Sequence, residues 1–440
     1  MNLSGKRVVV MGLGHFGGGV GLSRFLVEQG AELLVTDLGS AKQLHASISQ
    51  LADLPITYRM GEHRTSDFTT ADLVVVNPAV DQRDNRFLQA AASADIPITS
   101  EIRLLIQRLP NRARTIAITG TAGKSTVTSM IGHCLSKLIG PGNVHVGGNI
   151  GGSLLEKLDK FSKENWIVLE LSSFMLEGLA SDRWSPYMAV ITNFFPNHLD
   201  RHSTIEAYRS AKQTILDFQE PHDIAILGPD TASQFHPNVP RVFVRELNDP
   251  NVTDTICLSI PGLHNQMNGL LAADAVGAAL DIEWQRAAQS LEDYPGLPHR
   301  LEMVAERGGV RYMNDSKSTT PDAAKIALEC FGQGIVHLIV GGYDKGSDMC
   351  NLAQDASMHC RAIYTIGATG NAIAREAEDG LAEVIRCVNI NRAVEESARR
   401  VRSGEVVLLS PGCASWDQFD NYEHRGGAFI GAVNKYVAPV

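Results

Sequence analysis

The stretch TGTAGKST, residues 119–126, follows the apolar run TIAI at 115–118 and precedes a candidate helix. A strand, a glycine-rich turn and a helix in this order are typical of a phosphate-binding loop. Gly120 and Gly123 allow the backbone to turn amide hydrogens toward phosphate oxygens. Lys124 supplies a positive charge, and Ser125 supplies a hydroxyl for Mg²⁺. Ile118 replaces the first glycine of the full Walker A spacing, so the stretch predicts a nucleoside triphosphate site from a partial match.

A second glycine-rich turn, GLGHFG at residues 12–17, also follows an apolar strand. Its spacing is that of a dinucleotide-binding turn, and Asp37 stands about 20 residues later, where such domains place a ribose-binding acid. The same turn can also hold the phosphates or the uridine of another nucleotide. The turn alone therefore leaves NAD, NADP and a different nucleotide open.

Composition narrows the class of protein. The 440 residues suggest two to four domains, with 44% hydrophobic and 20% charged residues as in soluble globular proteins. The formal charge of -10 argues against a broad nucleic-acid surface. No apolar run approaches the roughly 20 residues that span a bilayer, and the N-terminal sequence has no signal-peptide layout. Together with seven cysteines that form no CxxC pair, this predicts a cytoplasmic protein that binds neither nucleic acid nor membrane.

Alternating strands and helices begin three times along the chain, which predicts an α/β fold. A linker is expected at YPGLPHR, residues 294–300, because of its two prolines and its glycine. We expect domains at 1–97, 98–298 and 299–440. The expected strands lie at 6–11, 32–36, 73–76, 96–99, 115–118, 167–169, 188–191, 336–340, 362–366 and 406–409, with a helix at 21–29.

Further motifs occur in a fixed order: GGNIGGSLL, LELSSFMLE, TNFFPNHLDRH, YRSAK, GLHNQMN, LPHRLE, NDSKSTTPDA, GGYDKG and SPGCASWDQF. With TGTAGKST, this ordered set resembles the Mur ligases of peptidoglycan synthesis, and within them the members that add D-glutamate. The resemblance extends from Gly12 to about Arg425. It implies an N-terminal Rossmann-like domain for a UDP-sugar, a central P-loop ATPase-like domain with a mainly parallel sheet, and a C-terminal Rossmann-like domain.

The resemblance also implies an activity. A Mur ligase of this kind uses ATP to convert the carboxylate of UDP-N-acetylmuramoyl-L-alanine into an acyl phosphate, which the amine of D-glutamate then attacks. ADP and phosphate are released, and cations must neutralise the reacting groups. We expect such an enzyme to act as a monomer in cytoplasmic cell-wall synthesis.

The same resemblance assigns metal ligands. Ser125 and Glu170 would hold one Mg²⁺, and His198 with a carbamylated Lys212 would contribute to a second. An unmodified ammonium would repel Mg²⁺, whereas burial favours the neutral amine that carbamylation requires. Glu170 ends an apolar strand, where a carboxylate is costly unless it is paired or bound to a metal. Lys124, Glu170, His198 and Lys212 are therefore the expected catalytic residues.

The remaining contacts are carried over position by position. The resemblance implies ATP contacts at Gly120, Thr121, Ala122, Gly123, Lys124, Ser125, Thr126, Asn268, Arg300 and Asp315. Contacts with the UDP-sugar are implied at Gly14, His15, Phe16, Asp37, Asn77, Ala79 and Asn149. Contacts with D-glutamate are implied at Lys317, Thr319, Lys345, Ser415 and Tyr422. Arg300 and Asp315 lie beyond the linker, so their contact with ATP would require domain closure.

Some positions depart from the family pattern, and some alternatives stay open. Ala122 replaces an asparagine, Met175 a glutamine, and Leu38-Gly39 a Thr-Arg pair, while Gly17–Gly19 form an unusual turn. A folylpolyglutamate synthase-like ligase would not need the first domain. A non-catalytic UDP-sugar-binding homologue would not need the metal and phosphate groups. A NAD-dependent oxidoreductase would leave Lys124, Ser125, Glu170 and Lys212 unexplained.

Overall fold

The computed structural model describes residues 2–15, 17–246, 256–346 and 348–437. The expected UDP-sugar contact Phe16 lies outside the described residues. The chain divides into two compact units, one of residues 1–256 with 267–291 and one of residues 257–266 with 292–440. No helix in the described part of the chain has both the length and the apolar character needed to cross a membrane.

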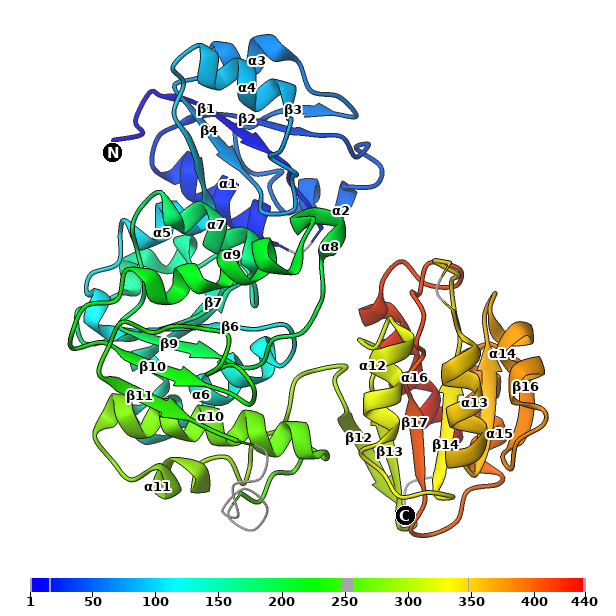
Figure 1. The fold of residues 1–440 in the computed structure, drawn as a ribbon. Coiled ribbons are helices and arrows are strands. Elements are labelled where there is room, and N and C mark those ends of the chain that lie inside the picture. Colours follow the sequence, from blue (N-terminus) through cyan, green and yellow to red (C-terminus); the bar gives the residue numbers. More distant parts are fainter. Residues whose placement is uncertain (1, 16, 247–255, 347, 438–440) are drawn as a thin grey trace. The chain divides into compact units, whose positions relative to one another are not determined.

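The first unit begins with a parallel five-stranded sheet in the order β3-β2-β1-β4-β5. Figure 1 shows α3 and α4 on one side of this sheet and α1 on the other. β1 and β4 are apolar and almost fully buried, as expected for central parallel strands. The elements are β1 Arg7–Met11, α1 Gly18–Glu28, β2 Glu32–Asp37, α2 His45–Ser49, β3 Thr57–Met60, α3 Thr65–Thr69, β4 Leu73–Val76, α4 Arg86–Ser93, β5 Ile98–Ser100 and α5 Glu101–Ile106.

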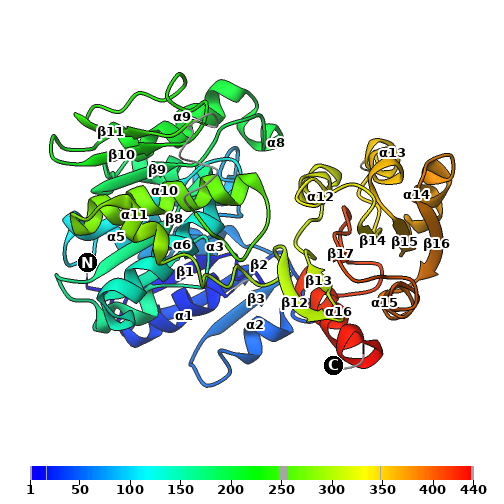
Figure 2. The same ribbon diagram turned by 90° about the horizontal axis from the view of Figure 1, so that it is seen from below.

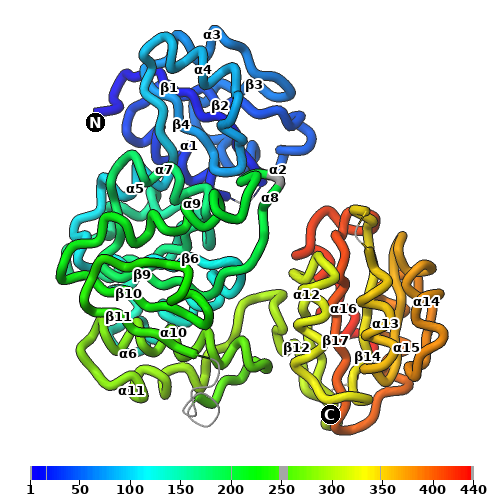
Figure 3. The backbone as a smooth tube through the Cα atoms, viewed as in Figure 1, coloured from blue at the N-terminus to red at the C-terminus, as the bar shows by residue number. Residues whose placement is uncertain are grey.

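A second sheet of the same unit has six parallel strands in the order β11-β10-β9-β6-β8-β7. Figure 3 traces the backbone from β9 past α8 into α9. The elements are η1 Arg112–Arg114, β6 Thr115–Thr119, α6 Lys124–Ile139, η2 Pro141–Asn143, β7 Val144–Gly148, η3 Leu155–Lys160, β8 Trp166–Glu170, α7 Ser173–Ala180, β9 Met188–Ile191, α8 Leu199–His202, α9 Ile205–Asp217, β10 Ile224–Leu227, β11 Arg241–Val244, α10 Leu263–Leu280 and α11 Trp284–Gln289.

One apolar core joins the two sheets of this unit. Phe25 of α1, Leu105 of α5 and Leu155 of η3 belong to the same buried cluster as Leu176 of α7 and Ile215 of α9. Because burial of apolar surface is the main favourable term in folding, this shared core holds the N-terminal and central sheets together.

The second unit contains a six-stranded sheet in the order β12-β13-β17-β14-β15-β16, in which only the β12–β13 pair is antiparallel. Figure 2 shows α12, α13 and α14 on one face of this sheet and α15 and α16 on the other. A separate apolar cluster lies under each face. The elements are β12 Glu302–Arg307, β13 Val310–Asn314, α12 Pro321–Leu328, β14 Val336–Val340, α13 Cys350–His359, β15 Ala362–Ile366, α14 Gly370–Ala377, β16 Glu383–Val388, α15 Ile390–Ala398, β17 Val406–Leu409 and α16 Tyr422–Tyr436.

The α/β class and the three sheets confirm the predicted fold, and each predicted strand is present with ends shifted by at most a few residues. β5 pairs with β4 and so extends the first sheet to Ser100, beyond the expected boundary at residue 97. The boundaries between domains stay predictions.

Candidate functional site

The phosphate-binding loop connects β6 to α6 and is shaped by its glycines. Gly120 has φ 148° and Gly123 has φ 78°, both positive values that favour glycine. A Cβ at Gly120 would lie 1.9 Å from Thr192 Oγ1, and one at Gly123 would lie 2.6 Å from Asn268 Oδ1. Larger residues are therefore excluded by space as well as by backbone conformation. α6 begins at Lys124, directly after Gly123, and the N-terminus of a helix is a place where backbone amides bind anions.

The strand next to β6 braces this loop. The Asn193 side chain accepts a hydrogen bond from the Ala122 amide at 2.8 Å and donates to the Ala122 carbonyl at 3.1 Å. Thr192 Oγ1 donates to the same carbonyl at 2.6 Å. Ala122 has no side-chain amide of its own, and the two residues that follow β9 hold its backbone by these hydrogen bonds. The motif TNFFPNHLDRH contains both residues, but it indicates no role for them, because their contact with the loop depends on β9 lying beside β6.

Lys212 reaches the loop from α9. Its ammonium donates to the Gly120 carbonyl at 2.7 Å and lies 4.6 Å from the centre of the Tyr208 ring. The side chain is 1% exposed. Burial, and secondarily the charge of Lys124, lower the pKa of Lys212 to about 6. A neutral amine thus prevails at pH 7, which is the form that reacts with carbon dioxide.

Glu170 ends β8 in register with Ile118 of β6. It is 1% exposed, and Oε1 accepts a hydrogen bond from Asn149 Nδ2 at 2.8 Å. Oε2 is buried and accepts no hydrogen bond from the described residues. A buried carboxylate oxygen without a partner is costly, and a cation would remove that cost. Asn149 orients this carboxylate in the structure, and its expected contact with the UDP-sugar stays a prediction.

His198 precedes α8 and adopts a left-handed conformation, with φ 53°. Its ring is exposed and lies 6.1 Å from the Tyr208 ring, the same ring over which Lys212 lies. The structure therefore places His198 and Lys212 around one aromatic side chain. Phe174 packs against the His198 ring at 5.3 Å and limits its movement.

These groups fit a divalent cation bound together with phosphate. Glu170 offers a carboxylate oxygen that accepts no hydrogen bond from the described residues, and Ser125 stands in the first turn of α6. Within the part of the chain that is described, no three His, Cys, Asp or Glu side chains form a metal-binding group of their own. Phosphate or water oxygens, or a modified lysine, would have to complete the coordination of Mg²⁺.

A cavity of about 500 Å³ opens in the N-terminal sheet at the ends of β1, β2 and β4. Four expected UDP-sugar residues line it, namely Gly14, Asp37, Asn77 and Ala79. Asp37 accepts hydrogen bonds from the amides of Leu13 at 2.8 Å and Gly39 at 2.7 Å, so it also fixes the glycine turn. His15 is exposed and is not part of the cavity wall.

An arginine that the sequence did not indicate as functional connects the cavity wall to α8, the helix that follows His198. Arg201 of α8 donates to the Val80 carbonyl at 2.9 Å and to the Ala79 carbonyl at 3.3 Å. Its guanidinium also lies 4.1 Å from the centre of the Phe174 ring. The segment that carries His198 is therefore attached to the wall of the cavity within the same unit.

Two expected ATP contacts lie in the second unit. Asp315 accepts hydrogen bonds from Ser318 Oγ at 2.5 Å, from Ser410 Oγ at 2.8 Å and from the Leu301 amide at 3.2 Å. Burial raises the pKa of Asp315 to about 6, although these hydrogen bonds oppose the shift. Asp315 thereby anchors the segment that follows Arg300. Its role toward ATP, like that of Arg300, stays a prediction.

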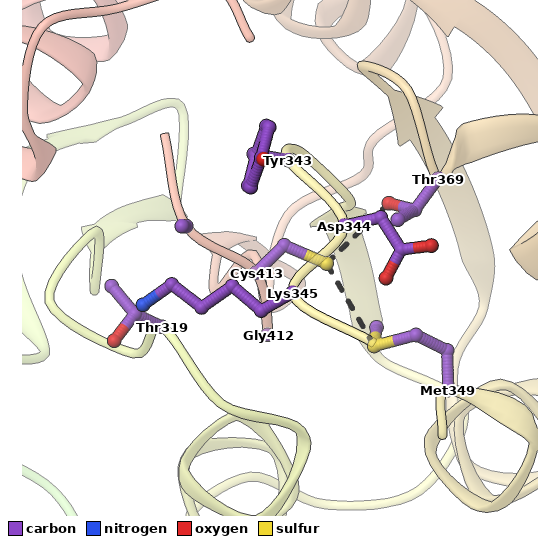
Figure 4. A pocket seen from close by; sticks show the side chains of 9 residues that line it. Thr319, Tyr343, Asp344, Lys345, Met349, Thr369, Gly412 and Cys413 are labelled. Atoms are coloured by element: carbon purple, nitrogen blue, oxygen red, sulfur yellow. Dashed lines mark hydrogen bonds between the residues drawn. The ribbon is translucent and has the colours of Figure 1, made fainter. Parts of the chain in front are cut away.

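The second unit also contains a small polar pocket at the carboxyl ends of β14 and β17. Thr319, Lys345 and Cys413 are among its lining residues, and in Figure 4 the Lys345 side chain extends toward Thr319. The volume is about 10 Å³, the room of one water molecule, so an amino acid would extend out of it. Ser415 is buried and follows Ala414, which also lines the pocket.

Both lysines expected to bind D-glutamate lie over aromatic rings. The Lys345 ammonium is 4.5 Å from the centre of the Trp416 ring, and the Lys317 ammonium is 3.7 Å from that of Tyr422. A ring face attracts a cation without neutralising it. The expected contacts of both lysines with D-glutamate stay predictions.

The other departures from the family pattern differ in consequence. Met175 is buried in the apolar core of the first unit, where an unbranched apolar side chain packs without a polar partner. Leu38 is exposed and lines the N-terminal cavity, so it replaces a polar contact there by an apolar one. Gly19 has no room for a Cβ, which would lie 2.0 Å from the Leu13 carbonyl oxygen.

Family models match all three parts of the chain. The Mur ligase MurD-like N-terminal domain matches residues 6–100, the Mur ligase middle domain residues 118–245, and the Mur ligase glutamate ligase domain residues 299–413.

Full-length relatives agree with these matches. A protein of Koribacter versatilis (strain Ellin345) named UDP-N-acetylmuramoylalanine--D-glutamate ligase is 39% identical, with 99% of this chain and 98% of that protein covered. A protein of the same name from Roseiflexus sp. (strain RS-1) is 37% identical, with 99% and 100% covered.

Solved structures share the fold. UDP-N-acetylmuramate-alanine ligase MurC of Thermotoga maritima has a TM-score of 0.61 at 18% identity, with 98% of this chain and 99% of that chain covered. MurF ligase of the same organism, solved in complex with ADP, has a TM-score of 0.60 at 14% identity, with 98% of each chain covered. The chain belongs to the Mur ligase family.

Proposed function

We propose that this protein is an ATP- and Mg²⁺-dependent ligase that joins D-glutamate to UDP-N-acetylmuramoyl-L-alanine and releases ADP and phosphate. The printed name of the relatives supports the two substrates. The observation that supports the chemistry most directly is the Glu170 carboxylate, which is buried beside a phosphate-binding loop and has one oxygen that accepts no hydrogen bond from the described residues.

The reaction has two steps that this chain's residues can assist. A carboxylate oxygen of the alanyl group attacks the γ-phosphorus of ATP, and ADP leaves. The amine of D-glutamate then attacks the acyl carbon, and phosphate leaves with the original carboxylate oxygen. The loop amides and Lys124 would hold the phosphates, and bound Mg²⁺ would neutralise negative charge that otherwise keeps the two anions apart.

Lys212 would act as a carbamate. Its neutral amine would add carbon dioxide and lose a proton, which turns a buried base into an anion beside the loop. The lowered pKa and the burial of Lys212 support this modification, and His198 near Tyr208 would share a second cation with it. Lys317 and Lys345 would bind the carboxylates of D-glutamate, with Thr319, Ser415 and Tyr422 around them.

The substrates are tested by a matrix of acceptors and amino acids. Purified protein is incubated with ATP, Mg²⁺, UDP-N-acetylmuramoyl-L-alanine or UDP-N-acetylmuramate, and D-glutamate, L-glutamate, D-aspartate or L-alanine. We expect phosphate release and a product of the summed mass minus water only for UDP-N-acetylmuramoyl-L-alanine with D-glutamate. Ligation of another amino acid alone would reject the proposed substrate, and no ligation in any combination would reject the ligase activity.

The role of Glu170 is tested by its dependence on Mg²⁺. Glu170→Gln keeps the size and the hydrogen bond from Asn149 but removes the charge. We expect the Mg²⁺ concentration for half-maximal rate to rise about tenfold or more at fixed ATP. Glu177→Gln on the neighbouring helix α7 is the control, and an unchanged Mg²⁺ requirement in Glu170→Gln would contradict the assignment.

A further inference from the structure

Arg425 is a buried cation that the proposed chemistry leaves unused. It lies in the first turns of α16, is 1% exposed, and belongs to the second unit. Burial lowers the pKa of Arg425 to about 10, and the hydrogen bonds of its guanidinium go to a hydroxyl and to carbonyl groups of the backbone rather than to a carboxylate. Within the described part of the chain, the hydrogen bonds of Arg425 involve no carboxylate, and a buried cation with such partners needs a structural or functional reason.

The hydrogen bonds of Arg425 reach two different loops. Nε donates to Ser316 Oγ at 3.0 Å and Nη2 donates to the Ser316 carbonyl at 2.8 Å. Nη1 donates to the carbonyls of Cys413 at 2.8 Å and Ala414 at 3.0 Å. One planar guanidinium thus fixes the turn after β13 and the loop after β17 at a set separation.

Two more segments are connected through these partners. The Tyr343 amide donates to the Ala414 carbonyl at 2.9 Å, which ties in the loop after β14. Ser316 Oγ donates to the Tyr422 carbonyl at 2.7 Å, which ties in the start of α16. The residues expected to bind D-glutamate lie on or beside these four segments, namely Lys317, Thr319, Lys345, Ser415 and Tyr422.

We infer that Arg425 is the positioning residue of the amino-acid pocket: it sets the spacing of the loops that carry the carboxylate-binding groups. This inference rests on the proposed function, because it takes the pocket beside Lys345 as the site for a dicarboxylic amino acid. Because Arg425 is only 1% exposed, we do not expect its guanidinium to touch the substrate. Its loss changes the distances between groups that must bind the two carboxylates together, so affinity for the amino acid falls first.

Arg425→Lys is the first test variant, because it keeps the positive charge and removes the planar fork. We expect the KM for D-glutamate to rise about tenfold or more, while the KM for ATP and for the UDP-sugar stays within twofold. Ser316→Ala is the milder variant and leaves Arg425 intact. It should raise the KM for D-glutamate about threefold, and the double variant should show less than the product of the two effects.

His337→Gln is the matched control for destabilisation. His337 is 2% exposed and lies near the start of β14, at the end of the strand away from Lys345. Its two ring nitrogens form hydrogen bonds with the Tyr364 hydroxyl at 2.9 Å and with Glu405 Oε2 at 3.0 Å. It should lower the melting temperature without changing the KM for D-glutamate. A loss of melting temperature alone therefore cannot imitate the expected result.

The outcomes separate the two proposals. If the wild-type protein does not ligate D-glutamate, the proposed function fails. If the wild type is active but Ser316→Ala and Arg425→Lys leave the KM for D-glutamate within twofold, or raise all three KM values equally, the role of Arg425 is overturned. Should Arg425→Lys not fold, Ser316→Ala decides by the same criterion.

Discussion

Lys212 in the first unit and Lys345 in the second differ in what surrounds their ammonium groups. Lys212 is 1% exposed, and burial with the charge of Lys124 lowers its pKa to about 6. Lys345 is exposed, and its ammonium lies over the Trp416 ring at 4.5 Å. Burial disfavours the charged form, whereas a ring face attracts it. We therefore expect one residue type to undergo covalent modification in one place and to bind a carboxylate in the other.

The largest expected effect comes from removing the buried amine. Lys212→Met should lower kcat about 10²- to 10³-fold or more, because the carbamate can no longer form. In protein depleted of carbon dioxide, where Lys212 carries no carbamate, the same change should raise the melting temperature. At neutral pH the unfolded chain protonates this lysine and the folded chain does not, so the buried amine costs stability, and the cost grows as the pH falls toward 6.

Initial rates and thermal melts at pH 7.5 check both parts of this prediction. Lys157→Met changes an exposed lysine of η3; it is the matched control and should change neither the rate nor the melting temperature. A variant Lys212→Met that is as active as the wild type, or that is clearly less stable, would contradict the described environment of Lys212.

The second prediction sharpens the comparison through pH. Enzyme depleted of carbon dioxide and then given the same concentration of dissolved carbon dioxide at each pH should regain activity at pH 7 to 8, where Lys212 is neutral, and much more slowly at pH 5, where it is protonated. The assay itself is run at pH 7.5 after a timed incubation, so that only the modification step depends on pH. Recovery at equal rates at pH 5 and pH 8 would argue against a neutral amine as the reacting form.

Sequence and structure contribute unequally to this comparison. Buried β6 and the glycines of the loop could be predicted, because apolar runs and positive-φ turns leave a local signal. The contribution of Asn193 could not be predicted in the same way, because it depends on β9 lying beside β6. Strand order is a property of the whole sheet and has no local sequence pattern.

The contacts of two arginines could not be predicted from the sequence for the same reason. Arg201 and Arg425 donate hydrogen bonds to backbone carbonyls more than 10 residues away in the chain. Because every residue has a backbone carbonyl, the sequence does not show which one accepts such a bond. The resemblance to a family assigned ligand contacts, whereas the residues that position those contacts required coordinates. Asn149 illustrates the difference, since its side chain orients Glu170 in the structure.

In the second unit, we expect the larger effect on the KM for D-glutamate from removing the charge of Lys345. Lys345→Met should raise the KM for D-glutamate about tenfold or more and leave the KM for ATP unchanged, because one charge-assisted contact is lost. Lys435→Met is the control, since the Lys435 ammonium lies 4.9 Å from the Tyr436 ring centre but away from the pocket. Equal effects of the two variants would show that Lys345 has no special role.

A smaller effect is expected from the ring beneath that charge. Trp416→Leu should raise the KM for D-glutamate only about two- to fivefold, the range of an exposed cation–π contact. Trp416→Phe should lie between the leucine variant and the wild type. If Trp416→Leu were as damaging as Lys345→Met, the ring would have to do more than hold the ammonium, and the comparison with Lys212 would need revision.

The central claim is ATP-dependent ligation through an acyl phosphate, and isotope transfer tests it most directly. UDP-N-acetylmuramoyl-L-alanine that carries ¹⁸O in both oxygens of the alanyl carboxylate is incubated with ATP, D-glutamate and the protein. The masses of the released phosphate and of the product are then measured by mass spectrometry. We predict one ¹⁸O in the released phosphate and one in the new amide. Released phosphate without ¹⁸O, with both labels left on the acceptor, would contradict the mechanism.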